Sequence, residues 1–395
     1  MSDLRYWLWL SRLGISPRIV RRCLRAVGSA RELFLADPAS LRGVEGLREG
    51  DLRALERKDI SGAEAIEEQC RKTGVEILCL QDADYPDRLR SIEDPPPVIY
   101  IKGKLPPVDD RLCIGVVGTR KASEYGKATA ERIAGELAQK GGVVVTGLAE
   151  GIDSAAAQGA LRARGTVIAV LGTGVDVVYP AWNGKLQETV ARLGALVSEY
   201  PPGTGTSRYG FPRRNRIISG LCLGVAVVQA PQKSGALITA AHAQEQGRDV
   251  FVVPGAVDDP GFQGSNGLIR DGAQLIRSGG DILEEYGFRY PELLRKMPRT
   301  EAENWEKPTK EAIDKAESVD YSSLSEQLES LTEPELKAVE VLAGGACYKD
   351  ELIRHSGLSA PSAMAALTML QLKGYVREEN GRYRLLVRYE NNGTV

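Results

Sequence analysis

The chain has 395 residues, of which 43% are apolar and 26% are charged, a composition typical of a soluble globular protein with two to four domains. No run approaches the ~20 apolar residues that span a bilayer, and the N-terminus lacks the basic lead and cleavage site of a signal peptide. The six cysteines are scattered without a C-x-x-C spacing. This usage suits reduced thiols, so we expect a cytoplasmic protein without membrane contact.

The net charge of −2 hides an uneven distribution. Residues 111–280 carry 18 basic and 13 acidic side chains, whereas residues 281–395 carry 15 basic and 21 acidic ones. A basic middle segment followed by an acidic one indicates that a polyanion binds in the middle of the chain.

Residues 1–70 have the pattern of short helices separated by glycine turns. Helices are expected over 4–13, 17–26 and 30–36, and Ser16 before Pro17 is typical of a helix start with proline at its first position. The turns and the four arginines between 18 and 25 resemble helix-hairpin-helix or SAM-like modules, which bind DNA or protein. A packing bundle with a solvated basic face is an equally good interpretation.

Residues 71–285 are expected to form one α/β domain. Strands at 74–80 and 98–101 flank a proline-rich connector and lead into six apolar runs of strand length, at 114–117, 143–146, 167–171, 195–198, 225–229 and 250–253. Helical segments lie between most of them, at 124–140, 152–163, 184–193, 214–221 and 235–246. This alternation predicts a mainly parallel sheet with helices on both faces. Ligands bind such sheets at the carboxyl ends of the strands.

The remaining chain is expected to form a linker and a last small domain. Residues 286–330 are charged and poor in apolar side chains, which is typical of a linker. Residues 331–390 contain three expected helices and two strands around Asn380-Gly381, a hairpin signal. This order predicts a winged helix-turn-helix. Its third helix has one basic residue, Lys373, so protein binding or a weak DNA role is as well supported as sequence-specific readout.

The first βα turn of the α/β domain combines several groups that attract anions. Gly118-Thr119-Arg120 turns the chain after a buried strand, and Ser123 is a suitable N-cap for the helix that follows. Free backbone N–H groups, the positive end of the helix dipole and Arg120 would converge on one point, which favours a phosphate. An ordinary βα turn with an exposed arginine stays open, because the turn is neither G-x-G-x-x-G nor a P-loop.

Two later junctions also place cations at helix starts. Three arginines and an asparagine (Arg213, Arg214, Asn215 and Arg216) follow Phe211. Arginines grip phosphates, and the ring offers a face on which a base can stack. Lys233, Ser234, Gly235 and Thr239 form the second such junction. At a further junction, 146–153, Asp153 is expected to cap the helix that follows.

No catalytic or metal-binding pattern stands out in the sequence. The two histidines, His242 and His355, lie in different expected domains, and no His, Cys and carboxylate cluster supports a metal site. There is no G-x-S-x-G elbow, Walker lysine or paired acid–base set. We therefore expect a domain that holds a long anion, with no metal, no cofactor and no catalysis.

Seven segments succeed one another in an order typical of one family: VVGTRKASEYGK, VVTGLAEGIDSAAAQGAL, VIAVLGTGVDVVYP, LVSEYPPGT, FPRRNRIISGL, QAPQKSGALITAAHAQEQGRDVFVVPG and GSNGLIRDGAQLI. Over roughly residues 74–285 the chain closely resembles the DNA-processing protein A family (DprA, also called Smf). The resemblance implies an extended Rossmann-like domain that binds and protects single-stranded DNA. It also implies a homodimer that loads the RecA recombinase during natural transformation.

Carried over by position, the resemblance implies which residues contact single-stranded DNA. They are Gly118, Thr119, Arg120, Ser123, Phe211, Arg213, Arg214, Asn215, Arg216, Lys233, Ser234, Gly235 and Thr239. The implied dimer surface involves the helix from Gly235 and the strand Val250–Val253. Three positions depart from many relatives, which have a basic residue at Glu150, a histidine at Ala157 and a glutamate at Gln229. Because Glu150 would repel phosphate, we expect it to lie outside the pocket.

Two other functions stay open. A nucleotide phosphoribohydrolase of the lysine-decarboxylase-like type also uses a Rossmann sheet, but residues 253–257 lack the P-G-G-x-G-T segment of that family. A transcription factor that acts through the winged domain is weakened by the acidic balance of residues 281–395.

Overall fold

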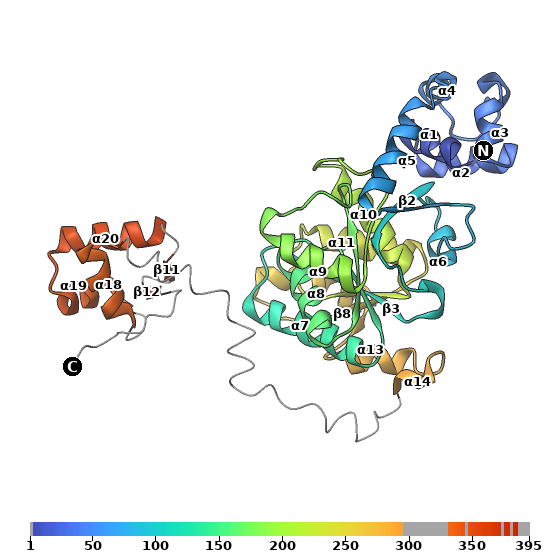
Figure 1. Ribbon diagram of the computed structural model, residues 1–395. Helices are drawn as coiled ribbons and strands as arrows, with labels where there is room; N and C mark the ends of the chain where they lie inside the picture. Colours follow the sequence, from blue (N-terminus) through green and yellow to red (C-terminus); the bar gives the residue numbers. More distant parts are fainter. Residues whose placement is uncertain (1–2, 295–330, 344–346, 373–374, 380–381, 386–395) are drawn as a thin grey trace. The chain divides into compact units, whose positions relative to one another are not determined.

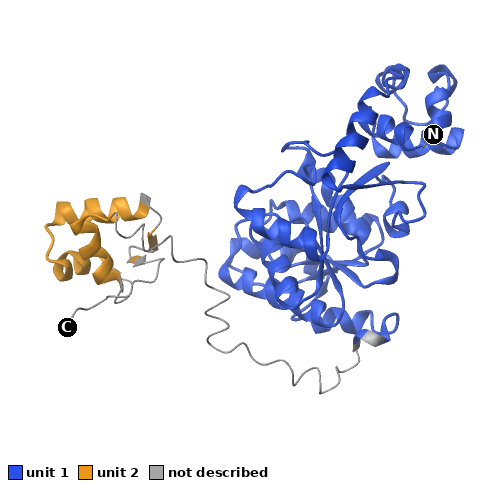
Figure 2. Ribbon diagram, viewed as in Figure 1, with its two compact units in different colours: residues 1–296 blue, residues 297–395 orange. Residues whose placement is uncertain are grey.

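The structure is a computed structural model that describes residues 3–294, 331–343, 347–372, 375–379 and 382–385. The chain divides into two compact units, residues 1–296 and 297–395 (Figure 2). Each unit has its own apolar core. Most of the expected linker, residues 295–330, lies outside the described residues. The first part of the expected linker, residues 286–294, is described, and it belongs to the first unit because Tyr286 and Tyr290 are buried in the core of that unit.

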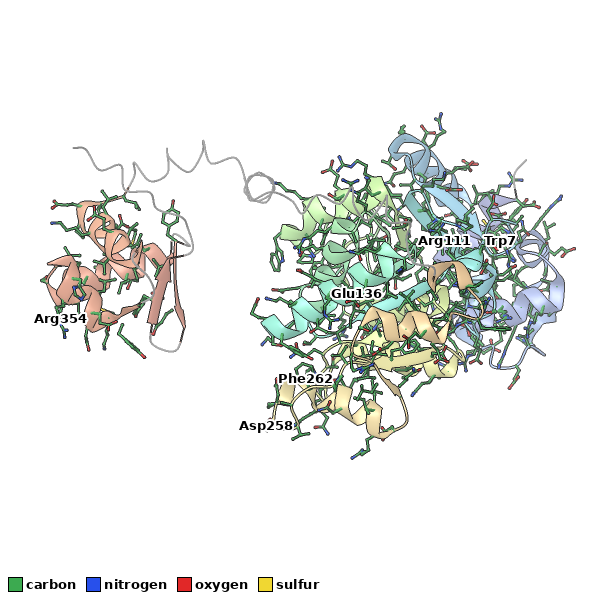
Figure 3. All side chains as sticks on the ribbon, turned by 90° about the horizontal axis from the view of Figure 1, so that it is seen from below. Trp7, Arg111, Glu136, Asp258, Phe262 and Arg354 are labelled. Atoms are coloured by element: carbon green, nitrogen blue, oxygen red, sulfur yellow. The ribbon has the colours of Figure 1, made fainter. Side chains whose placement is uncertain are left out.

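Five helices and a 3₁₀ turn form the N-terminal part of the first unit. They are α1 (Leu4–Arg12), α2 (Pro17–Val27), α3 (Ala30–Leu35), η1 (Pro38–Leu41), α4 (Glu49–Glu56) and α5 (Ser61–Thr73). Trp7, labelled in Figure 3, and Trp9 are buried in a cluster that continues to Tyr100 on the sheet. The helices therefore share an apolar core with one face of the sheet.

The arginines of α2 make contacts within the molecule. Arg18 forms an ion pair of 2.6 Å with Glu93, and Arg21 donates to the carbonyl oxygen of Ile92. Arg22 donates to the carbonyl oxygen of Glu45 at 2.8 Å. Of the two interpretations of this basic face, these contacts favour packing.

The first unit contains a nine-stranded sheet in the order β1-β2-β6-β5-β4-β3-β7-β8-β9. The strands are β1 (Glu76–Cys79), β2 (Val98–Gly103), β3 (Cys113–Val117), β4 (Val143–Thr146), β5 (Thr166–Leu171), β6 (Ala195–Ser198), β7 (Gly224–Val227), β8 (Asp249–Val252) and β9 (Gln274–Leu275). In this spatial order, each strand from β6 through β5, β4, β3, β7 and β8 to β9 is parallel to its neighbour. Strand β2 pairs antiparallel with β6, and β1 pairs antiparallel with β2 at the edge of the sheet. The predicted mainly parallel sheet is confirmed.

Helices cover both faces of the sheet (Figure 1). The helices are α6 (Asp87–Arg90), α7 (Glu124–Gln139), α8 (Ile152–Arg162), α9 (Gly184–Leu193), α10 (Gly210–Leu221), α11 (Gly235–Glu245), α12 (Gln263–Arg270), α13 (Gly279–Glu285) and α14 (Pro291–Leu294). Apolar residues of α7, α8, α9 and α13 pack in one layer, and those of α10 and α11 pack in the other. Alternate residues of the strands point into each layer, because successive side chains leave a strand on opposite faces.

The strand order reverses at β3, which lies between β4 and β7. In an open parallel sheet, the loops that leave such a switch point diverge and form a crevice at the carboxyl ends of the strands. Within the first unit the expected helix starts agree with the structure, except that α10 begins four residues earlier than predicted, at Gly210. This shift brings Phe211 into the first turn of the helix.

The second unit has the predicted order of a winged helix. Its elements are α18 (Glu333–Ala343), β10 (Cys347–Tyr348), α19 (Lys349–Ser356), α20 (Ala360–Leu372), β11 (Val376–Glu379) and β12 (Arg382–Leu385). The strands form a small sheet in the order β10-β12-β11. The expected turn residues Asn380-Gly381 lie outside the described residues. Within the described part of the whole chain, no helix has both the length and the hydropathy needed to cross a bilayer.

Candidate nucleic-acid interface

A cleft of about 550 Å³ opens where the loops after β3 and β7 diverge. Its wall also includes residues that follow β4 and residues from the first turns of α10 and α11. Ten of the thirteen predicted site residues line it, namely Gly118, Thr119, Arg120, Phe211, Arg214, Asn215, Lys233, Ser234, Gly235 and Thr239. The structure thus brings together three segments that are far apart in the sequence.

The turn after β3 is fixed against the neighbouring strand. The backbone N–H of Thr119 donates to the carbonyl oxygen of Gln229 at 2.8 Å. A Cβ atom on Gly118 would lie 2.5 Å from Ile152, so only glycine fits at this position. The side-chain oxygen of Gln229 accepts from both the N–H and the hydroxyl of Ser123, at 2.9 and 3.1 Å. Gln229 therefore positions the turn that carries Arg120.

Four cations of the cleft wall are exposed: Arg120, Lys121, Arg208 and Lys233. Asp153 is the one carboxylate among the described residues that line the cleft, and it is 5% exposed. The cleft also meets the N-terminus of α11, where Ser234 caps the helix by accepting from the N–H of Ala236 at 3.2 Å. Positive charge with almost no exposed negative charge favours a polyanionic ligand.

Arg214 belongs to the wall of the cleft rather than to its open surface. Its side chain is 4% exposed, and it donates to the carbonyl oxygens of Gly147, at 2.6 Å, and Val170. Burial lowers the pKa of Arg214 to about 10, although the nearby Asp153 carboxylate opposes this shift. Burial also raises the pKa of Asp153, opposed by Arg214 and by hydrogen bonds from the backbone. Desolvation thus outweighs the attraction between these two charges.

Asp153 does not cap α8, contrary to the sequence-based expectation. The cap position is Gly151, and the carboxylate of Asp153 instead accepts from the backbone N–H of Gly147 at 3.0 Å. Asp153 therefore holds the end of β4 in place beneath the cleft.

Three predicted site residues do not line the cleft. Arg216 is 3% exposed and forms ion pairs with Glu199 at 2.7 Å and Asp94 at 3.0 Å. Burial alone would lower the pKa of Arg216, but these two carboxylates outweigh it and the pKa is raised. Arg213 is exposed but lies outside the lining. Ser123 caps α7, accepting from the N–H of Gly126, and faces a separate hollow.

An aromatic pair stands beside the arginine of the first turn. The guanidinium carbon of Arg120 lies 5.1 Å from the ring centre of Phe211, within the range of a cation–π interaction. The ring of Tyr179 lies 4.9 Å from the same centre. Phe211 therefore combines an apolar surface with adjacent positive charge.

Sequence reasoning missed Lys121 and Arg208 as lining residues. Lys121 directly follows Arg120 in the same turn, so the turn itself contained the signal. Arg208 lies two residues before the observed helix start at Gly210, and the expected start at 214 places it outside the junction. Glu150 is exposed and outside the lining, as expected, and Ala157 is buried in α8. No group of three or more side chains suited to a metal ion occurs among the described residues.

Comparison with known proteins assigns the family. Residues 76–287 match the model of the DNA recombination-mediator protein A family, and residues 323–382 match the DprA winged helix domain. The chain belongs to the DNA recombination-mediator protein A family.

Members of this family resemble the chain in sequence and in structure. The chain is similar to Protein Smf of Synechocystis sp., with 38% identity over 72% of this chain and 73% of that protein. Its identity to the DNA processing protein DprA of Bacillus subtilis is 44%, over 54% of this chain and 72% of that protein. The crystal structure of DNA processing protein A from Streptococcus pneumoniae superposes with a TM-score of 0.64 and 35% identity, covering 72% of this chain and 99% of that one. The family identified from the seven sequence segments is confirmed.

Proposed function

We propose that the chain binds single-stranded DNA in the cleft between the β3 and β7 loops and acts as a recombination mediator without catalysing a reaction. The observation that carries this proposal is the gathering of four exposed cations and Phe211 around one cleft. Among the described lining residues its single carboxylate, Asp153, is buried. Cations bind the phosphates and the ring stacks on a base, which together form the usual means of holding an unpaired strand.

The aromatic residue favours a single strand over a duplex. The bases of a duplex are already stacked on one another, so a ring in a cleft gains contact area only from an unpaired base. Arg120 beside Phe211 places a cation within reach of the phosphate next to that base.

The partner and the setting follow from the family. In this proposal the bound strand is protected in the cytoplasm and loaded with the RecA recombinase during natural transformation, in keeping with a family described as recombination mediators.

A homodimer is part of the same proposal. Strand β8 lies between β7 and β9, and residues 250–253 are buried. The predicted strand contact is therefore covered, and α11 is the accessible part of the expected dimer surface.

The alternative of a nucleotide phosphoribohydrolase-like enzyme has no support in the cleft. Asp153, the carboxylate of its wall, is buried and already accepts a hydrogen bond from Gly147. A general base must instead reach the substrate's proton in a productive pose.

Competition measured by fluorescence anisotropy tests the proposal. A labelled single-stranded oligonucleotide is bound to the full chain and displaced by unlabelled single strand, duplex or nucleoside monophosphate, and RecA filament growth is followed with and without the chain. We expect the single strand to compete far better than the other two and filament growth to accelerate. Release of free base from the monophosphate would support the enzyme instead, and a footprint on specific duplex DNA would support a transcription factor.

A further inference from the structure

A loop beside the cleft exposes large apolar side chains. It connects β5 to α9, and it leaves Val178 43%, Tyr179 37% and Trp182 71% exposed. The other two tryptophans among the described residues, Trp7 and Trp9, are 3% and 1% exposed in the core. An exposed cluster of this kind marks a binding surface, because apolar area in water is costly unless a ligand covers it.

This loop is continuous with the wall of the cleft. It leaves the carboxyl end of β5, the edge at which the cleft opens. The ring of Tyr179 contacts that of Phe211, which lines the cleft, with an angle of 38° between the ring planes. Trp182 follows in the same loop, in the 3₁₀ turn Ala181–Asn183. The aromatic surface thus extends from inside the cleft to outside it.

The loop is held by buried polar contacts on both sides of Trp182. Asn183 is 8% exposed and donates to the carbonyl oxygen of Leu148 at 3.0 Å and to the hydroxyl of Ser154 at 2.8 Å. Gln187, 4% exposed, donates to the carbonyl oxygen of Val177 at 3.1 Å. These contacts fix the backbone on both sides of Trp182, which lowers the entropy that the loop loses when a ligand stacks on the indole ring.

A cation accompanies the aromatic surface. Lys185 is exposed in the first turn of α9, and within the described part of the chain it forms no ion pair. An indole ring followed three residues later by an unpaired ammonium group provides the two contacts that a nucleotide needs, one for the base and one for the phosphate.

We propose that Trp182, supported by Tyr179 and Lys185, is a second stacking site that carries the single strand beyond the cleft. It takes at least one further unpaired nucleotide, with the base on the indole and the phosphate on the ammonium group. The inference rests on the proposed function, since it extends the same strand. It assigns to the β5–α9 loop a binding role that depends on the length of the DNA.

A length series tests this inference. Affinities are measured for oligothymidylates of about 4 and about 16 nucleotides, which bracket the site sizes of single-strand binding domains. We expect Trp182→Ala to weaken binding of the longer strand by roughly tenfold, the effect of losing one stacked base, and to leave the shorter strand unchanged. Trp182→Phe should retain most of the affinity. Phe288→Ala is the matched control, because Phe288 is a fully exposed ring outside this loop.

Two readouts separate this inference from the proposed function. Binding of the longer strand should quench tryptophan fluorescence in the unsubstituted chain, and most of that quenching should disappear in Trp182→Phe. If Trp182→Ala binds both lengths like the unsubstituted chain while Arg120→Ala loses binding, the second site is wrong and the cleft stands. An equal loss at both lengths would also overturn the second site. If the unsubstituted chain binds neither strand, the proposed function itself fails.

Discussion

Two arginine-bearing junctions meet at the same edge of the sheet and use their charges differently. In the turn after β3, Arg120 and Lys121 are exposed, and neither forms an ion pair within the described residues. Within α10, Arg214 and Arg216 are 4% and 3% exposed and are held by carbonyl oxygens or carboxylates.

The comparison shows that an arginine in one of these two junctions has one of two roles. An exposed one offers its charge to a ligand, and a buried one holds the wall that shapes the site. The two roles predict different effects of substitution. Replacing an exposed arginine should weaken DNA binding, whereas replacing a buried arginine should destabilise the fold.

The largest effect on stability is expected for Arg216→Ala. The substitution leaves the carboxylates of Glu199 and Asp94 without their cation, and Glu199 has a side chain that is 8% exposed. Breaking a buried ion pair by removing one partner costs about 3–5 kcal/mol. Urea unfolding at neutral pH measures this cost. Arg213→Ala, at an exposed position, should change stability by less than about 0.5 kcal/mol, and equal stabilities for the two variants would contradict the assignment.

A smaller and partly reversible loss is expected for Arg214→Ala. Here one buried carboxylate, Asp153, loses its cation, and we expect a cost of about 3 kcal/mol. Adding Asp153→Asn should recover part of this loss, because the second substitution removes the buried negative charge. A double-mutant cycle in urea gives the coupling between the two sites. Strictly additive losses would show that the two charges do not interact.

Next in size is the loss expected for Gln229→Leu. The side-chain oxygen of Gln229 accepts two hydrogen bonds from Ser123, and leaving these half-buried donors unpaired costs about 1–3 kcal/mol. DNA affinity should fall as well, since the turn that carries Arg120 loses support. Gln229→Glu keeps a side-chain oxygen that accepts from both donors near the positive end of α7 and should be tolerated. Similar losses in the two variants would contradict this account.

The sequence predicted the sheet and most of the cleft because both depend on local patterns. Apolar runs of strand length indicate β3 to β8, and glycines with cations at the junctions indicate the ten predicted residues that line the cleft. Whether each arginine is buried and paired or exposed depends on partners that are distant in sequence. Asp94 lies 122 residues before Arg216, and Gly147 lies 67 residues before Arg214. No local pattern reports such pairing, so the burial of Arg214 and Arg216 could not be predicted.

The smallest effect is expected for Ser123→Ala. Ser123 caps α7 through the N–H of Gly126, and losing a serine cap costs about 1 kcal/mol. Because Ser123 faces a separate hollow, DNA affinity should change little. Thermal unfolding and anisotropy on the same preparation check both statements. A large loss of affinity with unchanged stability would return Ser123 to the binding site.

The salt dependence of single-strand binding tests the role of the exposed cations most directly. Each phosphate neutralised by a cation contributes about 0.7 to the slope of log affinity against log salt concentration. We predict that Arg120→Ala and Lys233→Ala each make the slope shallower by about that amount, whereas Arg213→Ala leaves it unchanged. Identical slopes for the unsubstituted chain and for all three variants would show that the cleft does not hold the strand.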